Sequence, residues 1–326
     1  MSFLGRRDDV GLTKEAVRLT GETTAANWIP YMDFNLQEKR EYFIDDSAFG
    51  RREGVLQTGI TQKMVEGDWE MVLDPDIAGF PLFYLFGTDT PTTASGATTH
   101  VLSVNQSSQL PTFSAFYERA ALSWMRAVGV TVNEVEIGME VGSNAGTLKA
   151  SLMAISEATT TSQTPSYTKP TRTLLAQHAV MRYASAVAGL AAGTAYGIRS
   201  FKINVKNNAE YNWILGTVVP NDIFSKKFEV ECEFTAVMST AAFDTFSRAG
   251  TQQAVQFDII NTGAANIGAS VLKPRISFEI PPSRWEVTYS ISKDDITTFD
   301  CVGQIEYSVS DGFIIRPTIV NAIATY

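Results

Sequence analysis

The amino-acid sequence predicts an all-β protein made of two tandem β-sandwich or barrel domains, related by internal duplication, with one short helix in each domain. From Trp28 onward, short segments of alternating apolar and polar residues are separated by clusters of Gly, Asn, Asp and Thr, a pattern typical of strands joined by turns. A stretch rich in Thr, Ser and Pro begins at residue 159 and has the composition of an interdomain linker. The length of 326 residues suits two domains. We therefore expect an N-terminal arm at 1–27, a first domain at 28–158, a linker at 159–176 and a second domain at 177–326.

The strands follow from the alternating segments. In the first half we expect them at 31–43, 63–73, 100–106, 112–118, 126–141 and 147–155, and in the second half at 178–187, 197–206, 227–237, 254–260, 275–280, 285–292, 297–309 and 313–320. Residues 44–62 and 87–99 are interpreted as long loops. The arm is polar and is interpreted as a loop with a short helical piece near Thr13–Leu19, either frayed or docked.

One helix interrupts the strands in each half. Asp74 and Pro75 form a helix start, with a carboxylate at the N-cap and proline at the first helical position, and Gly87 can end that helix. In the second half Ser239 or Thr240 can cap a helix that Gly250 ends. The aromatic residues at helical spacing in both segments are expected to pack in the core.

Two segments of the chain align without a gap. GDWEMVLDPDIAGFPLFYLFG at 67–87 lies over VECEFTAVMSTAAFDTFSRAG at 230–250, an offset of 163 residues that matches Trp69 with Cys232 and Phe80 with Phe243. Upstream, Phe34–Tyr42 resembles Phe201–Tyr211 at an offset of 167. An internal duplication explains both matches, and the alternative is two β-rich segments that share alternation by accident. A duplicated β-domain is expected to have a separate core in each half and to leave sheet edges there, and these edges carry few blocking lysines.

Acidic residues alternate with apolar ones on three of the expected strands. Side chains two residues apart share a face of a strand, so each run forms a row of carboxylates about 7 Å apart. The rows are Glu66, Asp68 and Glu70; Glu229, Glu231 and Glu233; and Glu134, Glu136 and Glu140. A deliberately negative surface is the favoured interpretation, because solvated faces usually mix charges. A solvated face, a metal site or a catalytic carboxylate pair remain alternatives, although calcium ligands converge from loops instead of spreading along a strand.

The composition excludes several classes of function. Lys and Arg number 26 against 35 Asp and Glu, a net charge of −9, which disfavours a DNA-gripping domain. Two cysteines, Cys232 and Cys301, cannot make a four-thiolate zinc site, and we expect both to be buried free thiols. His100 and His178 are expected at the surface or at strand ends. No Gly-rich phosphate loop, nucleophile elbow or zinc spacing is present, so we expect no enzymatic activity, metal or cofactor.

Membrane insertion is not expected either. No apolar run approaches the roughly 20 residues of a membrane span, and the N-terminus lacks the apolar segment of a signal peptide. The sequence therefore predicts a soluble protein made inside the cell.

Most of residues 28–326 resemble a known family. The segments NWIPYMDFNLQEKREYFIDDSAFGRREG, EGDWEMVLDPDIAGFPLFYLFG and GVTVNEVEIGMEVGSNAGTLKASLMAISEA are similar to the major tail tube proteins of long-tailed, siphovirus-type bacteriophages. Two such halves in one chain correspond to a duplicated form. The resemblance implies a β-sandwich or barrel flanked by a helix, assembled into rings that stack into a non-contractile tail tube and conduct DNA into the host.

Residue roles implied by the resemblance follow the family's strands and loops. The lumen strands match Glu66, Asp68 and Glu70 with Glu229, Glu231 and Glu233, and less directly Glu134 and Glu136. The loop that contacts the next ring matches 44–62, with Asp45, Asp46, Phe49, Arg51, Arg52 and Glu53 as contact residues. The matching loop of the second half, near 212–226, is shorter. Because three chains supply six domains, we expect a trimeric ring with pseudo-sixfold symmetry.

The implied partners are further copies of the chain, tail terminator and tail-tip proteins and a tape measure protein, in a virion tail assembled in the host cytoplasm. DNA is expected to pass through the lumen without specific binding, repelled by the acidic wall over about 8–10 Å. Two other functions stay open: a two-domain β-sandwich that binds a small ligand or carbohydrate, and a hydrolase with a carboxylate pair.

Overall fold

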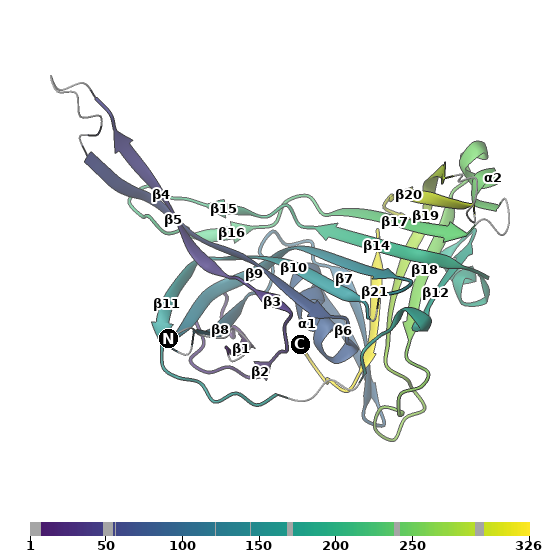
Figure 1. Cartoon of the computed structure of the whole chain (residues 1–326), viewed down its shortest axis with the longest axis horizontal. Coiled ribbons are helices and arrows are strands. Elements are labelled where there is room, and N and C mark those ends of the chain that lie inside the picture. The colour runs from purple at the N-terminus through teal and green to yellow at the C-terminus, as the bar shows by residue number, and fades with distance from the viewer. Residues whose placement is uncertain are drawn as a thin grey trace.

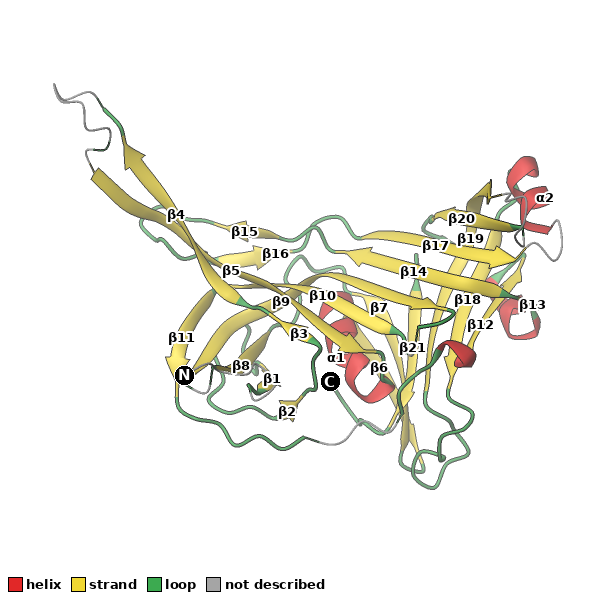
Figure 2. Cartoon of the chain, in the orientation of Figure 1, coloured by secondary structure: helices red, strands yellow, loops and turns green. Residues whose placement is uncertain are grey.

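The computed structural model describes residues 8–47, 55, 57–120, 122–143, 145–167, 172–237, 242–290 and 297–326. Strands dominate these residues, and helices are few and short (Figure 2). The first-half strands are β1 Val10–Lys14, β2 Asn27–Trp28, β3 Asp33–Phe34, β4 Gln37–Asp45, β5 Gln57–Val72, β6 Gly87–Ala94, β7 Ala97–Val104, β8 Phe113–Arg119, β9 Ser123–Glu140, β10 Thr147–Ala154 and β11 Ser156–Thr160. Those of the second half are β12 Ala179–Ala184, β13 Thr194–Tyr196, β14 Ile198–Lys206, β15 Glu210–Asn212, β16 Asp222–Phe224, β17 Glu229–Val237, β18 Gln253–Ile260, β19 Arg275–Ser290, β20 Thr298–Gln304 and β21 Arg316–Asn321. The all-β prediction is confirmed.

One antiparallel sheet, here called the main sheet, runs through both halves of the chain. Its order is β3 and β4, then β5–β10–β9–β14–β17–β20–β19. β3 and β4 pair with β5 in one continuous register, so together they form a single interrupted edge strand. The halves join where β9 pairs with β14, with Glu134 opposite Lys206. The two halves therefore share a sheet across the expected linker.

Two side sheets pack beneath the main sheet, one made of first-half strands and one that joins second-half strands with β6 and β7 of the first half. The first has the order β2–β1–β8–β9–β11, and the second the order β13–β12–β18–β19–β21–β7–β6. β9 and β19 are long enough to begin in a side sheet and end in the main sheet. Most buried apolar residues of both halves form one contiguous cluster, from Val10 to Tyr326, and two small clusters lie beside it. Separate cores in the two halves were expected, but the shared sheet merges them.

The same sequence of elements occurs twice. β1, β3–β4, β5, α1, β8, β9, β10 and β11 correspond in chain order and in sheet neighbours to β12, β14, β17, α2, β18, β19, β20 and β21. Phe34 lies opposite Trp69 as Ile203 lies opposite Cys232, so the edge strands match at an offset of 169 residues. The expected offset of 167 was wrong by two residues. A slip of two preserves the alternation, so the sequence pattern could not detect it.

The two helices correspond in the repeat but differ in environment. α1 (Pro75–Phe86) starts as expected: the Asp74 side chain accepts a hydrogen bond from the Asp76 amide at 3.0 Å, and Gly87 ends the helix at φ 82°. Its residues are nearly all buried, because it lies between β9 of one half and β21 of the other (Figure 2). α2 (Ala242–Ala249) lies at the end of the molecule and buries only Phe243 fully. The expected caps Ser239 and Thr240 lie outside the described residues.

Three expected loops contain strands. Residues 87–99 fall in the hairpin of β6 and β7, whose two-residue turn places Ser95 and Gly96 at positive φ, and the threonines that suggested a loop are also strand formers. The described residues among 44–62 lie at the far end of the long β4–β5 hairpin, which projects from the body (Figure 1). In the arm, β1 pairs with β8, and no helix forms at Thr13–Leu19.

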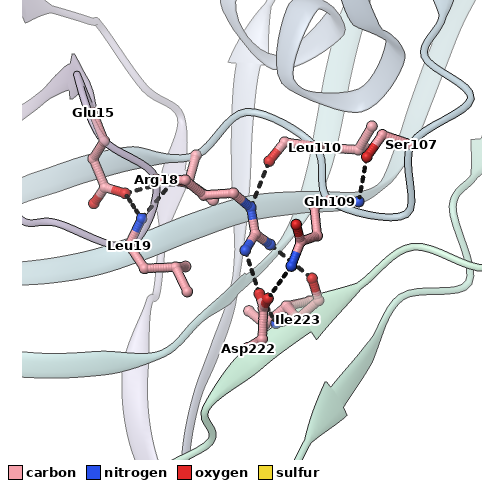
Figure 3. A network of polar contacts seen from close by, with 9 residues as sticks. Glu15, Arg18, Leu19, Ser107, Gln109, Leu110, Asp222 and Ile223 are labelled. Atoms are coloured by element: carbon pink, nitrogen blue, oxygen red, sulfur yellow. Dashed lines mark hydrogen bonds and ion pairs between the residues drawn. The ribbon is translucent and has the colours of Figure 1, made fainter.

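The N-terminal segment fastens the second half to the first. Arg18 pairs with the buried Asp222 of β16 and donates from Nη2 to the Ile223 carbonyl at 2.8 Å (Figure 3). Its Nε donates to the Leu110 carbonyl at 2.9 Å, and Gln109 donates to Asp222 at 2.7 Å. The short β15–β16 hairpin is thus held against the first half by a largely buried ion pair, an arrangement whose disruption is costly.

Candidate functional site

All eight acids expected to line a lumen lie on one face of the main sheet. Strand pairing places Asp68 and Glu134 opposite Ser151 of β10, and Glu136 and Glu231 opposite Asn204 of β14. We call this surface, taken along the edge strand from Asp33 to Lys39, the charged face. Its acids are Asp33, Glu66, Asp68, Glu70, Glu134, Glu136, Glu140, Glu229, Glu231, Glu233, Glu286 and Asp300, and its bases are Lys39, Lys149, Lys202, Lys206 and Arg284. Twelve acids against five bases leave a net charge of −7.

Lysines between the acidic rows were not anticipated from the sequence. Lys202 Nζ lies 2.8 Å from Glu136, Lys206 Nζ 2.9 Å from Glu231, and Lys39 Nζ 2.8 Å from Glu66. β10 and β14 carry lysines and lie between the acid-bearing strands, so they separate like charges that would otherwise face each other. Lys202 and Lys206 alternate with apolar residues along β14, a signal that reveals the mixture once the strand order is known.

The charged side chains on this face remain in contact with solvent. The Glu231 side chain is 64% exposed, and Glu140 and Glu233 are exposed as well. The hydrogen bond from Lys206 to Glu231 raises the lysine's pKa, and the bond from Lys202 to Glu136 acts likewise. Exposed pairs of this kind contribute about 0–1 kcal/mol each to stability. The charged face therefore has little structural purpose in the isolated chain.

The opposite face of the same strands forms the core, as expected from the alternation. Trp69, Cys232 and Phe234 are at most 2% exposed. Cys232 and Cys301 are buried free thiols, as predicted, and burial raises the pKa of both. Buried, protonated thiols are unreactive.

His100 is not at the surface, contrary to expectation. The ring is fully buried, with Nδ1 2.7 Å from an oxygen of Asp89 and Nε2 2.8 Å from the Ile323 carbonyl. It also contacts the ring of Tyr326, with 4.4 Å between centroids. Burial opposes the charged form, but the bonds to Asp89 and Ile323 outweigh it and raise the pKa of His100. His100 thus fixes the C-terminal segment to β7, which the sequence alone could not show.

The β4–β5 hairpin carries the expected ring-contact residues. Hydrogen bonds from the Ser47 side chain and from the Ser47 amide, the latter at 3.0 Å, lower the pKa of Asp45, and Asp46 follows it in the chain. Phe49, Arg51, Arg52 and Glu53 lie outside the described residues. Three adjacent apolar residues of β4 also lie on this hairpin and were not expected as contact residues: Tyr42, Phe43 and Ile44 are 55%, 51% and 56% exposed. Clustered exposed apolar residues mark an interaction surface.

Within the described residues, no group of three or more His, Cys, Asp or Glu side chains is arranged to hold a metal ion. No helix of the described residues is long and apolar enough to cross a membrane. The charged face and the free ends of the main sheet are thus the features that invite a functional explanation.

Comparison with known proteins gives one match. A family model described as phage tail tube protein matches residues 5–302. No curated protein matches the chain.

Proposed function

Because this chain belongs to the phage tail tube protein family, we propose that it is a structural protein of the virion tail that closes into rings of three copies, stacked into a tube that conducts DNA. No enzymatic step and no cofactor is part of this role. The observation that carries the proposal is the charged face, which extends without interruption over two equivalent units of one chain.

The internal repeat supports three chains in each ring. Each chain contributes two units with the same strand order, β3–β4–β5–β10–β9 and β14–β17–β20–β19, joined edge to edge. Repeating that joint between chains extends the sheet until it closes on itself. Six units from three chains then form a ring with pseudo-sixfold symmetry, and closure removes the exposed sheet edges.

In such a ring the charged face lines the bore. The net charge of −7 on each chain repels a polyanion at short range, because the Debye length is about 8 Å at physiological salt. The interleaved lysines pair with acids of the same face, so no cluster of free cations is presented to phosphates. DNA can then move along the bore without being held.

The β4–β5 hairpin is the proposed contact between stacked rings. It projects beyond the body (Figure 1), and Tyr42, Phe43 and Ile44 give it an exposed apolar surface. The sequence from the end of β4 onward adds mixed charge and one aromatic residue, with Asp45, Asp46, Phe49, Arg51, Arg52 and Glu53 as the proposed contact residues. Its counterpart in the second half, β15–β16, is short and fastened to the first half, so the stacking hairpins alternate with short ones around the ring.

The proposed partners follow from a tail position: further copies, terminator and tip proteins at the two ends of the tube, and a tape measure protein. Assembly takes place in the host cytoplasm. Electron microscopy of the purified full-length chain tests the proposal. Tubes whose rings contain three chains support it, and a stable monomer or a ring of six chains contradicts it.

A further inference from the structure

We propose that the β19 edge of one copy pairs antiparallel with the β3–β4 edge of the next, in the same register that β9 and β14 use inside the chain. This inference rests on the proposed ring and adds the residues that join it. It places Asn35 opposite Glu286 and Asp33 opposite Thr288 across each interface between copies.

The main sheet ends in two edges without a strand partner among the described residues. β3 and β4 pair only with β5, and Arg284–Ser290 pairs only with β20. The two edges bound the main sheet on opposite sides, with β5, β10, β9, β14, β17 and β20 between them, so one chain cannot join them to each other. An unpaired edge is a template for a strand from another molecule.

The chain already contains this joint once. In the repeat, β19 corresponds to β9, and the β3–β4 edge corresponds to β14. Val135 and Trp285 occupy equivalent places, since each lies opposite the matched residue of β10 or β20, Ala150 or Gly303. Phe34 and Ile203 are equivalent in the same way. The internal pair Glu136–Asn204 therefore corresponds to Glu286–Asn35, and Gly138–Lys202 to Thr288–Asp33.

Along the free β3–β4 edge, the residues whose backbone groups point outward are those that this register requires. Inside the chain, the Val141 amide donates to the Arg199 carbonyl at 2.7 Å and the Asn207 amide to the Asn133 carbonyl at 2.8 Å, so the odd-numbered residues of β14 bond β9. Their counterparts at an offset of 169 are Phe34 and Leu36. The Asn35 amide donates inward to the Asp68 carbonyl at 3.1 Å, which directs the backbone groups of Phe34 and Leu36 outward.

Side chains on both faces of the joint are compatible. On the core side, Phe34 and Leu36 meet Val287 and Trp285, where the internal joint has Ile203 and Val205 against Ile137 and Val135. A groove of about 550 Å³ lies beside Phe34 and Leu36 and leaves room for the incoming strand. On the charged face, Arg284 meets Gln37, so no two like charges stand directly opposite each other.

Cysteine cross-linking of assembled protein tests the register. The facing pairs on the charged face are non-hydrogen-bonded pairs, in which Cα atoms lie about 4.5 Å apart and a disulfide can form. After oxidation with diamide, N35C/E286C and D33C/T288C should each shift from monomer to covalent dimer and trimer on a non-reducing gel, with reversal by reductant. E136C/N204C, at the matching place of the internal joint, should form an intramolecular disulfide and serves as the positive control.

The register-shifted variant N35C/T288C and the wild type should stay monomeric on the gel, since Cys232 and Cys301 are buried. Cross-linking of the shifted pair instead, or of neither predicted pair while rings assemble and E136C/N204C oxidises, overturns the inference but leaves the proposed function standing. Wild-type protein that forms no rings contradicts the proposed function. Cross-linked oligomers without tubes would support the edge pairing and reject the tube.

Discussion

Reversing four acids of the charged face should turn a passive bore into one that holds DNA. The variant E70K/E140K/E231K/E233K changes the charge of the face by +8 per chain, from −7 to +1, and places twelve new lysines in a ring of three chains. Glu140, Glu231 and Glu233 are exposed, and the one ion pair that is lost, Lys206–Glu231, contributes at most about 1 kcal/mol. The variant chain should therefore fold and assemble.

Retention of duplex DNA by intact tubes measures the effect. At 50 mM salt the lysine variant should sediment with DNA that resists nuclease, whereas wild-type tubes should not. If about 6–10 phosphates are contacted, affinity falls by roughly 10³–10⁵ between 50 and 200 mM salt, so the DNA should be released. The matched variant E70Q/E140Q/E231Q/E233Q, whose face keeps a charge of −3, should retain none. Intact lysine tubes that protect no more DNA than wild type would refute the placement of this face in the bore.

Three further predictions concern stacking and stability. Deleting residues 46–58 should leave a folded subunit that cannot form tubes, and normal tubes in micrographs would refute the proposed stacking contact. Gly67→Ala should lower the free energy of unfolding by about 1–3 kcal/mol in a urea titration, because a Cβ there would lie 2.5 Å from the Leu36 Cα. Gly59→Ala, on the same strand with open space, should be near neutral, and equal losses for the two would contradict the close contact. His100→Gln should lower the free energy of unfolding more at pH 5.5 than at pH 8.5. Because the pKa of His100 is raised in the folded state, its protonated ring stabilises the fold fully below about pH 6.5, and this contribution is lost as the pH rises through the folded pKa. An equal loss at both pH values would argue against a protonated ring.

Local patterns predicted most of the strands and both helices. Alternation located the acid-bearing strands to within a few residues, and Asp74, Pro75 and Gly87 marked the ends of α1 because each acts through its own backbone. The hairpin at 87–104 was missed because threonine occurs in both loops and strands. The two turn residues at positive φ, Ser95 and Gly96, were the signal that indicates a hairpin there. Local sequence preferences were therefore sufficient where a single residue determines where a helix ends or a turn forms.

Contacts between segments that lie far apart in the chain could not be predicted from the sequence. That β14 pairs with β9 depends on which edges meet, and this pairing placed lysines among the acidic rows. The burial of His100 depends on Asp89 and on a carbonyl 223 residues away. The same limit explains why a slip of two residues in the edge strand was invisible.

The covalent union of two repeats changes how assembly proceeds. Every second joint of the proposed ring, the one between β9 and β14, forms within a molecule, at an effective concentration that does not depend on how much protein has accumulated. Closing the circle then takes two encounters between separate molecules where unlinked repeats would take five, since the last joint forms within the ring in both cases, and each avoided encounter spares its loss of translational and rotational freedom. Tubes of this design should begin to grow at lower protein concentrations than tubes built from single repeats with the same joint.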